Sequence, residues 1–281
     1  MLPTNEMAVI ETIHLFPILD KELIGLLRSL TPEEWAHSTI AKKWTVKDIA
    51  AHLLDGNIRT LSLSRDQHLL IPPVAIDEYR DLVNYLNDLN AQWVTAMKRV
   101  SPGMLTDWLE STGKQYCAYL ATLDPGATAI FSVAWAGETV SKNWFHIARE
   151  YSEKFIHQLQ IRHALDKPGL ITKELFYPFI DTLMRALPHT FHTMNAPAGT
   201  LIKINVSGEA GGNWFLSRKN QGWVLTENNN GSPAAEVSMD PETAWKLFSK
   251  GISPAEAEQQ VLINGDKLLG KHVLTMVSVM A

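Results

Sequence analysis

The stretch that decides the fold reads Trp44-Thr45-Val46-Lys47-Asp48-Ile49-Ala50-Ala51-His52-Leu53-Leu54. Thr45 and Asp48 have the spacing of a capping box, with Asp in the position usually held by Glu, which predicts that a helix starts here. Apolar residues continue at helical spacing to about residue 67. His52 shares a stripe with Ile49 and Leu53, so we expect its side chain to face the inside of a helical bundle.

Helical periodicity also dominates the chain on both sides of this stretch. The spacing of apolar residues predicts helices over residues 6–30, 76–100, 103–123, 141–165 and 171–195. Pro17 lies inside the first of them and predicts a kink. Thr31-Pro32 predicts the start of a short helix that carries Trp35. Residues 129–140 lack the helical period and predict a strand-like or irregular excursion.

The period changes from helical to alternating after the small and turn-forming residues 196–200. Ile202, Ile204 and Val206 are predicted to face one way from a half-buried strand. Further strands are expected at 214–216, 223–225 and 235–239, and helices after Asp240-Pro241, Ser253-Pro254 and the turn Asn264-Gly265-Asp266. The predicted fold class is therefore an N-terminal all-α four-helix bundle, residues 1–195, followed by a smaller α+β domain, residues 196–281.

Composition excludes several classes of protein. The 281 residues are 46% hydrophobic and carry a formal net charge of -5, which argues against disorder and against a generally basic nucleic-acid binder. The single cysteine, Cys117, excludes a disulfide framework and a four-cysteine zinc site. The sequence has no phosphate loop, dinucleotide fingerprint or nucleophile elbow. It also has no uncharged apolar run of about 18 residues and no secretory pattern at its start. We expect a soluble cytoplasmic protein that binds neither nucleic acid nor membranes.

The helix predicted over 141–165 carries an unusual polar stripe. His146, Glu150, Glu153 and His157 are spaced i, i+4, i+7 and i+11, which places them within roughly 60° of one another on one helix face. Such a stripe is either a solvated face with salt-bridge partners or part of a site. His52 alone is likewise compatible with a satisfied core histidine. Together, however, an inward histidine and a second helix with Glu-x-x-x-His supply two imidazoles and a carboxylate, a set that binds a divalent metal and leaves a ligand position open.

At this point the chain resembles a known family. The segment from Trp44 to Leu54 and the run Glu153-Lys154-Phe155-Ile156-His157-Gln158 are similar to the two motifs of the mycothiol-dependent maleylpyruvate isomerase family, in the DinB-like bundle superfamily. The C-terminal part resembles the sterol-carrier-protein-like domain found in many members. The resemblance implies that His52, Glu153 and His157 are ligands of a divalent metal, usually zinc. It also implies a catalytic arginine in the C-terminal domain, for which Arg218 is the candidate.

The resemblance further implies a function. A low-molecular-weight thiol (mycothiol, bacillithiol or glutathione) would ionise at the metal and add to an electrophilic substrate, so that the enzyme is an isomerase or a thiol S-transferase. His52 would then have a catalytic role, and His146 and Glu150 are candidates for contacts to the metal ligands or to the substrate. Cys117 is interpreted as a small buried apolar residue of a helix.

Two alternatives stay open. The first is a metal-dependent hydrolase on the same bundle, with Glu150 as general base. The second is a non-catalytic protein whose C-terminal domain binds an apolar ligand or a partner. The sequence does not determine whether the chain is an enzyme, which thiol or electrophile it uses, or its oligomeric state.

Overall fold

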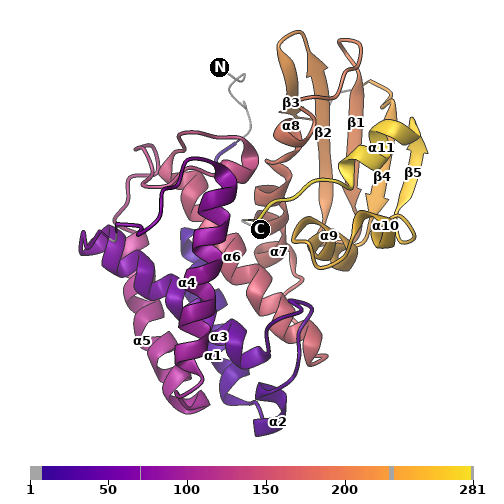
Figure 1. Cartoon of the computed structure of the whole chain (residues 1–281). Coiled ribbons are helices and arrows are strands. Elements are labelled where there is room, and N and C mark those ends of the chain that lie inside the picture. Colours follow the sequence, from indigo (N-terminus) through magenta and orange to yellow (C-terminus); the bar gives the residue numbers. More distant parts are fainter. Residues whose placement is uncertain (1–7, 70, 228–230, 280–281) are drawn as a thin grey trace. The chain divides into compact units, whose positions relative to one another are not determined.

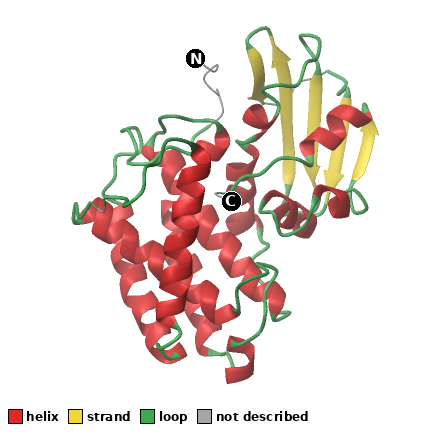
Figure 2. Ribbon diagram, in the orientation of Figure 1, coloured by secondary structure: helices red, strands yellow, loops and turns green. Residues whose placement is uncertain are grey.

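The structure, a computed structural model, describes residues 8–69, 71–227 and 231–279 (Figure 1). Up to Thr190 the regular elements of the described residues are helices, and the strands follow (Figure 2). The helical part contains η1 (Ile13–Leu15), α1 (Phe16–Arg28), α2 (Pro32–Trp35), α3 (Val46–Thr60), η2 (Leu61–Arg65), α4 (Tyr79–Met97), α5 (Pro102–Leu120), η3 (Ala134–Ala136), α6 (Asn143–Ala164), α7 (Lys173–Met184) and α8 (Leu187–Thr190). The remaining part contains β1 (Leu201–Val206), β2 (Gly212–Lys219), β3 (Gly222–Thr226), β4 (Ala235–Met239), α9 (Pro241–Phe248), α10 (Pro254–Ala257), β5 (Leu262–Gly265) and α11 (Lys267–Val273). The expected mostly helical N-terminal region and α+β C-terminal region are thus confirmed.

Helix α3 begins where the capping box predicts. The Thr45 hydroxyl accepts a hydrogen bond from the Asp48 amide at 3.3 Å, and the Asp48 carboxylate accepts one from the Thr45 amide at 3.0 Å. Both bonds satisfy amides that a helix start leaves without partners. The apolar face of α3, which includes Ile49 and Leu54, is fully buried in a cluster with residues of α1, α5 and α6. Near residue 60 the α-helical turns give way to the π-helical turn η2.

The expected kink at Pro17 is wrong. Pro17 occupies the first turn of α1, after the separate turn η1. A proline fits the first turn of a helix because its missing N–H would have no partner there in any case. Pro188 has the same effect at the start of α8, so the single helix expected over 171–195 is two helices, α7 and α8. The excursion at 129–140 is irregular, with only the short turn η3.

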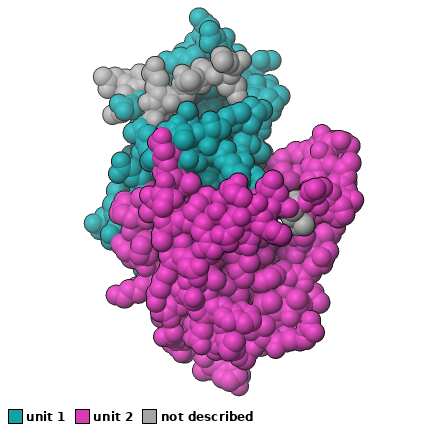
Figure 3. Space-filling view, turned by 90° about the vertical axis from the view of Figure 1, so that its left-hand side faces the viewer, with its two compact units in different colours: residues 1–11, 125–152, 169–279 teal, residues 12–124, 153–168, 280–281 magenta. Residues whose placement is uncertain are grey.

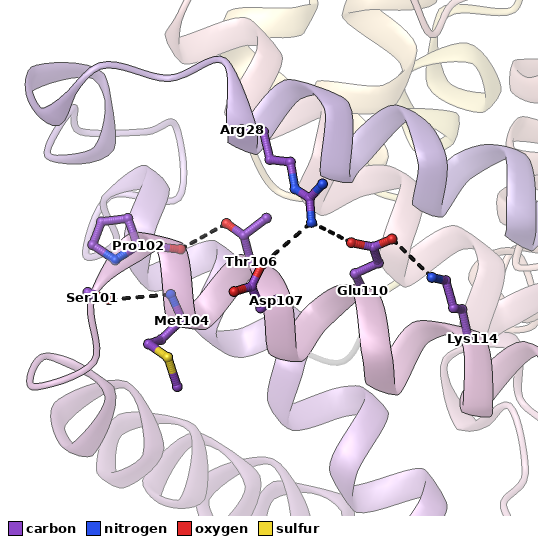
Figure 4. Close-up of polar contacts among 8 residues, drawn as sticks. All are labelled: Arg28, Ser101, Pro102, Met104, Thr106, Asp107, Glu110 and Lys114. Atoms are coloured by element: carbon purple, nitrogen blue, oxygen red, sulfur yellow. Dashed lines mark hydrogen bonds and ion pairs between the residues drawn. The ribbon is translucent and has the colours of Figure 1, made fainter.

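Polar contacts at the surface join α1 to α5 (Figure 4). Arg28 of α1 donates to Glu110 of α5 at 2.5 Å and approaches Asp107 at 3.5 Å, while Lys114 pairs with Glu110 one turn further on, at 3.0 Å. The Ser101 hydroxyl caps the start of α5 by accepting from the amide of Met104. Exposed ion pairs of this kind add little stability, so buried apolar faces hold these helices together.

The C-terminal sheet has the strand order β3-β2-β1-β4-β5. β1 pairs with β4 in parallel and with β2 antiparallel, and the outer pairs are also antiparallel. Ile202, Ile204 and Val206 are buried, as their alternation predicts. Strand β5 lies where the sequence predicts only a turn. This strand has four residues and buries only Ile263, so it carries almost no alternating pattern.

The chain forms two compact units (Figure 3). Apart from residues whose placement is not described, one unit comprises 12–124 and 153–168, and the other comprises 8–11, 125–152 and 169–279. Helix α6 contributes residues to both. The expected domain boundary between residues 195 and 196 stays a prediction, because compactness in the native chain does not report which segment folds by itself. No described helix combines the length and apolarity needed to cross a membrane.

Candidate functional site

One compact unit brings together, from helices α3 and α6, the three residues that the sequence predicts as ligands. His52 lies on α3, and Glu153 and His157 lie one turn apart on α6. The two imidazole rings meet edge to face with their centroids 4.7 Å apart. The Glu153 Oε2 atom lies 3.7 Å from the Nε2 atom of His157. The chain therefore places two imidazoles and one carboxylate side by side.

The ring of His157 is oriented by a glutamine one turn further along α6. Its Nδ1 atom lies 2.9 Å from the Oε1 atom of Gln160, an oxygen that can only accept. Nδ1 therefore carries the proton, and in the neutral ring Nε2 presents its lone pair toward Glu153. Two acceptors that face each other at 3.7 Å repel, and a cation held between them would remove that repulsion.

The ring of His52 has a buried polar atom without a partner. Its Nδ1 atom is inaccessible to solvent and makes no hydrogen bond. Burial lowers the pKa of His52 well below its usual value, and the nearby His157 and Arg59 lower it further, while Asn90 has the opposite effect. The imidazole is therefore neutral at pH 7, which is the form that binds metals. An unpaired polar atom costs free energy in a packed interior, and a bound ligand would remove that cost.

Trp44 forms an aromatic wall beside both rings. Its ring centroid lies 4.8 Å from that of His52 and 6.1 Å from that of His157. The loop before α3 holds this tryptophan, since the Trp44 carbonyl accepts from both the amide and the hydroxyl of Thr39. The wall shields one side of the ring pair from water, which strengthens electrostatic interactions at the site.

The donor set fits a divalent metal in chemistry, although the side chains do not surround one as they stand. Across residues 8–69, 71–227 and 231–279, no three His, Cys, Asp or Glu side chains have an arrangement that could hold a metal ion. The unpartnered Nδ1 of His52 and the facing acceptors of Glu153 and His157 are nevertheless the features expected of ligands.

His146 and Glu150, the N-terminal half of the polar stripe, belong to the other compact unit. Both contact Arg149, whose Nη2 atom lies 2.9 Å from His146 Nδ1 and 2.5 Å from Glu150 Oε1. Burial lowers the pKa of His146, Glu150 opposes the shift and Arg149 adds to it. An ion pair between neighbours thus accounts for this half of the stripe, and contact of His146 or Glu150 with substrate stays a prediction.

Arg218 lies on β2, opposite Trp223 of β3. Its Nη1 atom donates to the carbonyl of Lys219 at 2.6 Å, and its Nε atom is buried without a hydrogen-bond partner. It belongs to the compact unit that does not contain His52, so its catalytic role stays a prediction.

Two residues that support the ligand candidates were not predicted from the sequence. Gln160 orients His157, and the Trp93 indole of α4 donates to the carbonyl of Ala51, next to His52, at 2.8 Å. A signal existed for Gln160, because a residue three positions after a histidine on a helix lies beside it. None existed for Trp93, since a contact between separate helices has no fixed spacing in the sequence.

The chain matches one family model and several solved structures. The family model described as "Mycothiol maleylpyruvate isomerase N-terminal domain" matches residues 16–162. The structure is similar to the crystal structure of the mycothiol-dependent maleylpyruvate isomerase, with a TM-score of 0.54 and 11% identity over 92% of this chain and 94% of that one. A variant of that enzyme with a histidine-to-alanine substitution gives the same values.

A further solved structure, the ubiquinone synthesis protein UbiJ-SCP2, matches 34% of this chain and 94% of its own, with 13% identity and a TM-score of 0.25. No curated protein matches the sequence. The family model covers more than half of the 281 residues, and the motif residues His52, Glu153 and His157 all lie within it. The chain therefore belongs to the mycothiol maleylpyruvate isomerase N-terminal domain family.

Proposed function

We propose that this chain is a divalent-metal-dependent enzyme that uses a low-molecular-weight thiol to transform an electrophilic substrate, as a maleylpyruvate-isomerase-like isomerase or a thiol S-transferase. One observation carries the metal site: the lone pair of His157 faces the carboxylate of Glu153 beside a His52 ring that has a buried, unpartnered nitrogen. Membership of the family supports the thiol chemistry.

His52, Glu153 and His157 would hold the ion, and the pair of Glu153 and His157 would need only a small adjustment. Two ligands each about 2.1 Å from a tetrahedral zinc ion stand roughly 3.4 Å apart. The observed separation between Glu153 and His157 is 3.7 Å, and the Glu153 side chain, which is 31% exposed, has room to rotate. Gln160 keeps the ring of His157 in the required tautomer.

A divalent ion held by these three side chains would lower the pKa of a thiol bound beside it, so that the thiol would ionise near neutral pH. The chain's own residues do the rest. The neutral imidazoles and the carboxylate fix the site, and Trp44 excludes water from one side of it. Cys117 has no part in this chemistry, because the nucleophile comes with the thiol cofactor.

The two reaction types share their first step. The thiolate adds to an electrophilic carbon of a double bond, whose electron pair moves onto the activating group of the substrate. In an isomerase, rotation about the resulting single bond precedes loss of the thiolate, which is regenerated. In a transferase, a proton is taken up instead and the carbon–sulfur bond remains. Mycothiol is the first thiol to test, followed by bacillithiol and glutathione.

The metal is tested by elemental analysis of protein purified without a polyhistidine tag and supplemented with zinc. We expect about one ion per chain, and less than about 0.2 would contradict the proposal. His52→Ala should lower this occupancy while α3 stays folded, because alanine is the better helix former. His14→Ala, at an exposed position of the same compact unit, is the matched control and should retain the metal.

The thiol is tested by assaying maleylpyruvate and related electrophiles with and without each of the three thiols. Turnover that depends on a thiol and is lost in His52→Ala supports the proposal. Turnover without any thiol would instead favour hydrolysis, and a metal-free protein that keeps its melting temperature and binds an apolar ligand would indicate a non-catalytic role.

A further inference from the structure

A buried lysine joins four helices next to the ligand candidates. Lys154 follows Glu153 on α6 and is only 7% exposed. Its Nζ atom donates to Asn57 of α3 at 2.8 Å and to Asp20 of α1 at 3.1 Å, and it lies 4.7 Å from the ring centre of Tyr116 on α5. We refer to Asp20, Asn57 and Lys154 as the lysine clamp.

Burying the lysine clamp costs free energy. Asn57 is 1% exposed, and its amide also donates to the Thr112 hydroxyl of α5 at 3.1 Å. Gly113 makes room for the carboxylate of Asp20, because a Cβ atom there would come within 2.5 Å of Oδ2. Burying an ammonium group and its partners is unfavourable compared with apolar packing of the same volume. Such a network is best explained by the geometry that it imposes.

The clamp connects the two helices that carry the ligand candidates. Asn57 lies five residues after His52 on α3, and Lys154 lies between Glu153 and His157 on α6. Apolar contacts are non-directional, so they specify the register of two helices less sharply than a buried hydrogen bond does. A slip of one turn would move a helix by about 5.4 Å. The hydrogen bond between Lys154 and Asn57 survives only one register, because a displaced ammonium would be left buried without its partner.

We propose that Asn57 and Lys154 are positioning residues that fix the register of α6 against α3, so that Glu153 and His157 meet His52 around one metal ion. This inference rests on the proposed function. It does not require contact between the clamp and the ion. The role of the clamp is to keep the three ligands close enough for one ion to bridge them.

The test is Asn57→Ala in the full chain, which breaks the link to α3 and leaves the pair between Lys154 and Asp20. Zinc affinity is measured by competition with a chromophoric chelator, and coordination geometry by the visible absorption spectrum of the cobalt-loaded protein. We expect the zinc affinity to fall about 10-fold and the cobalt spectrum to change, as is typical when a residue that orients metal ligands is lost. Asn57→Asp retains an acceptor for Lys154 and should restore both.

Arg162→Met is the matched control. Arg162 is also buried on α6 and pairs with Glu22 of α1 at 3.1 Å, but this ion pair does not involve α3. It should lower the free energy of unfolding and leave zinc affinity and the cobalt spectrum unchanged. If Asn57→Ala does not fold, Lys154→Met breaks the same link from the α6 side.

Wild-type affinity and spectrum in Asn57→Ala would overturn the clamp and leave the proposed metal site standing. Equal losses of affinity in Asn57→Ala and Arg162→Met would also overturn it, since general loosening would then be the cause. A wild-type protein that binds neither zinc nor cobalt would refute the proposed function, and this inference with it.

Discussion

The thiol of Cys117 is held in an environment that suppresses its reactivity. Burial raises the pKa of Cys117 to about 12, the negative charge of Asp20 adds to the shift and Lys154 opposes it. The thiol also donates to the Asp20 carboxylate over 3.6 Å. Only the thiolate is an effective nucleophile, and almost none is present at neutral pH.

We therefore expect iodoacetamide to alkylate Cys117 in the native protein at about pH 8 more than about 100-fold more slowly than in urea-unfolded protein. Mass spectrometry of the intact chain over time gives both rates, with the unfolded sample as control. Comparable rates in the two states would show that the native thiol is accessible and ionised.

Two helical glycines should respond to alanine in opposite ways. At Gly113 the new Cβ would lie 2.5 Å from the Asp20 carboxylate, whereas at exposed Gly25 of α1 nothing lies within 4 Å. Gly113→Ala should lower the free energy of unfolding by about 1–3 kcal/mol through overpacking. Gly25→Ala should raise it by about 0.5–1 kcal/mol through helix propensity. Urea titrations monitored by circular dichroism measure both, and a stabilising Gly113→Ala would contradict the tight contact at Asp20.

At the scale of the element, α3 depends on its first turn. The capping box satisfies two backbone amides at the point where the chain enters the helix that carries His52. Thr45→Ala removes the hydroxyl that accepts from the Asp48 amide, and should cost about 1 kcal/mol. Thr45→Ser retains the hydroxyl and should cost much less. The midpoint of urea unfolding, at unchanged m-value, is the measurement. Equal losses in the two variants would show that the methyl group of Thr45, rather than the cap, is what matters.

Helix α6 shows how one element serves two environments. The spacing in the sequence correctly placed four polar residues on one stripe, but it treated them as one group. In the structure the N-terminal pair, His146 and Glu150, contacts Arg149. The C-terminal pair, Glu153 and His157, lies with His52 in the other compact unit. Periodicity reports the face of a helix and carries no information on which neighbour covers each turn of it.

At the scale of the whole molecule, three histidines make stability depend on pH. Burial lowers the pKa of His52, His146 and His189. Their folded pKa values lie below the unfolded value, so between the two the unfolded state binds more protons. The contribution of these three rings to the free energy of unfolding is therefore fully present above about pH 6.5, the unfolded pKa. It is lost as the pH falls through the lower pKa values of the folded state.

We expect metal-free protein to unfold at a lower urea concentration at about pH 5.5 than at about pH 7.5, and His146→Gln to weaken this dependence. His14→Gln, at an exposed position, should leave it unchanged. A midpoint that is independent of pH, or that rises on acidification, would contradict the assignment of these rings as neutral in the folded protein.

The sequence by itself determined most of the secondary structure and the three ligand candidates. Capping residues such as Thr45, Thr31 and Asp240 bond to amides within one turn of chain. The few residues around each helix start are therefore enough to predict it. The same locality explains the errors: Pro17 is read correctly only when the start of its helix is known, and β5 gains its strand character from pairing with β4.

Only the tertiary structure decided what surrounds the ligand candidates. The sequence separates His52 from His157 by 105 positions, and it cannot indicate that Trp44 lies against both rings or that Lys154 reaches Asn57. Side chains on different helices meet through the rotation and register of those helices, which the packing of the whole core selects. Local spacing specifies which residues share a face, and packing specifies what that face meets.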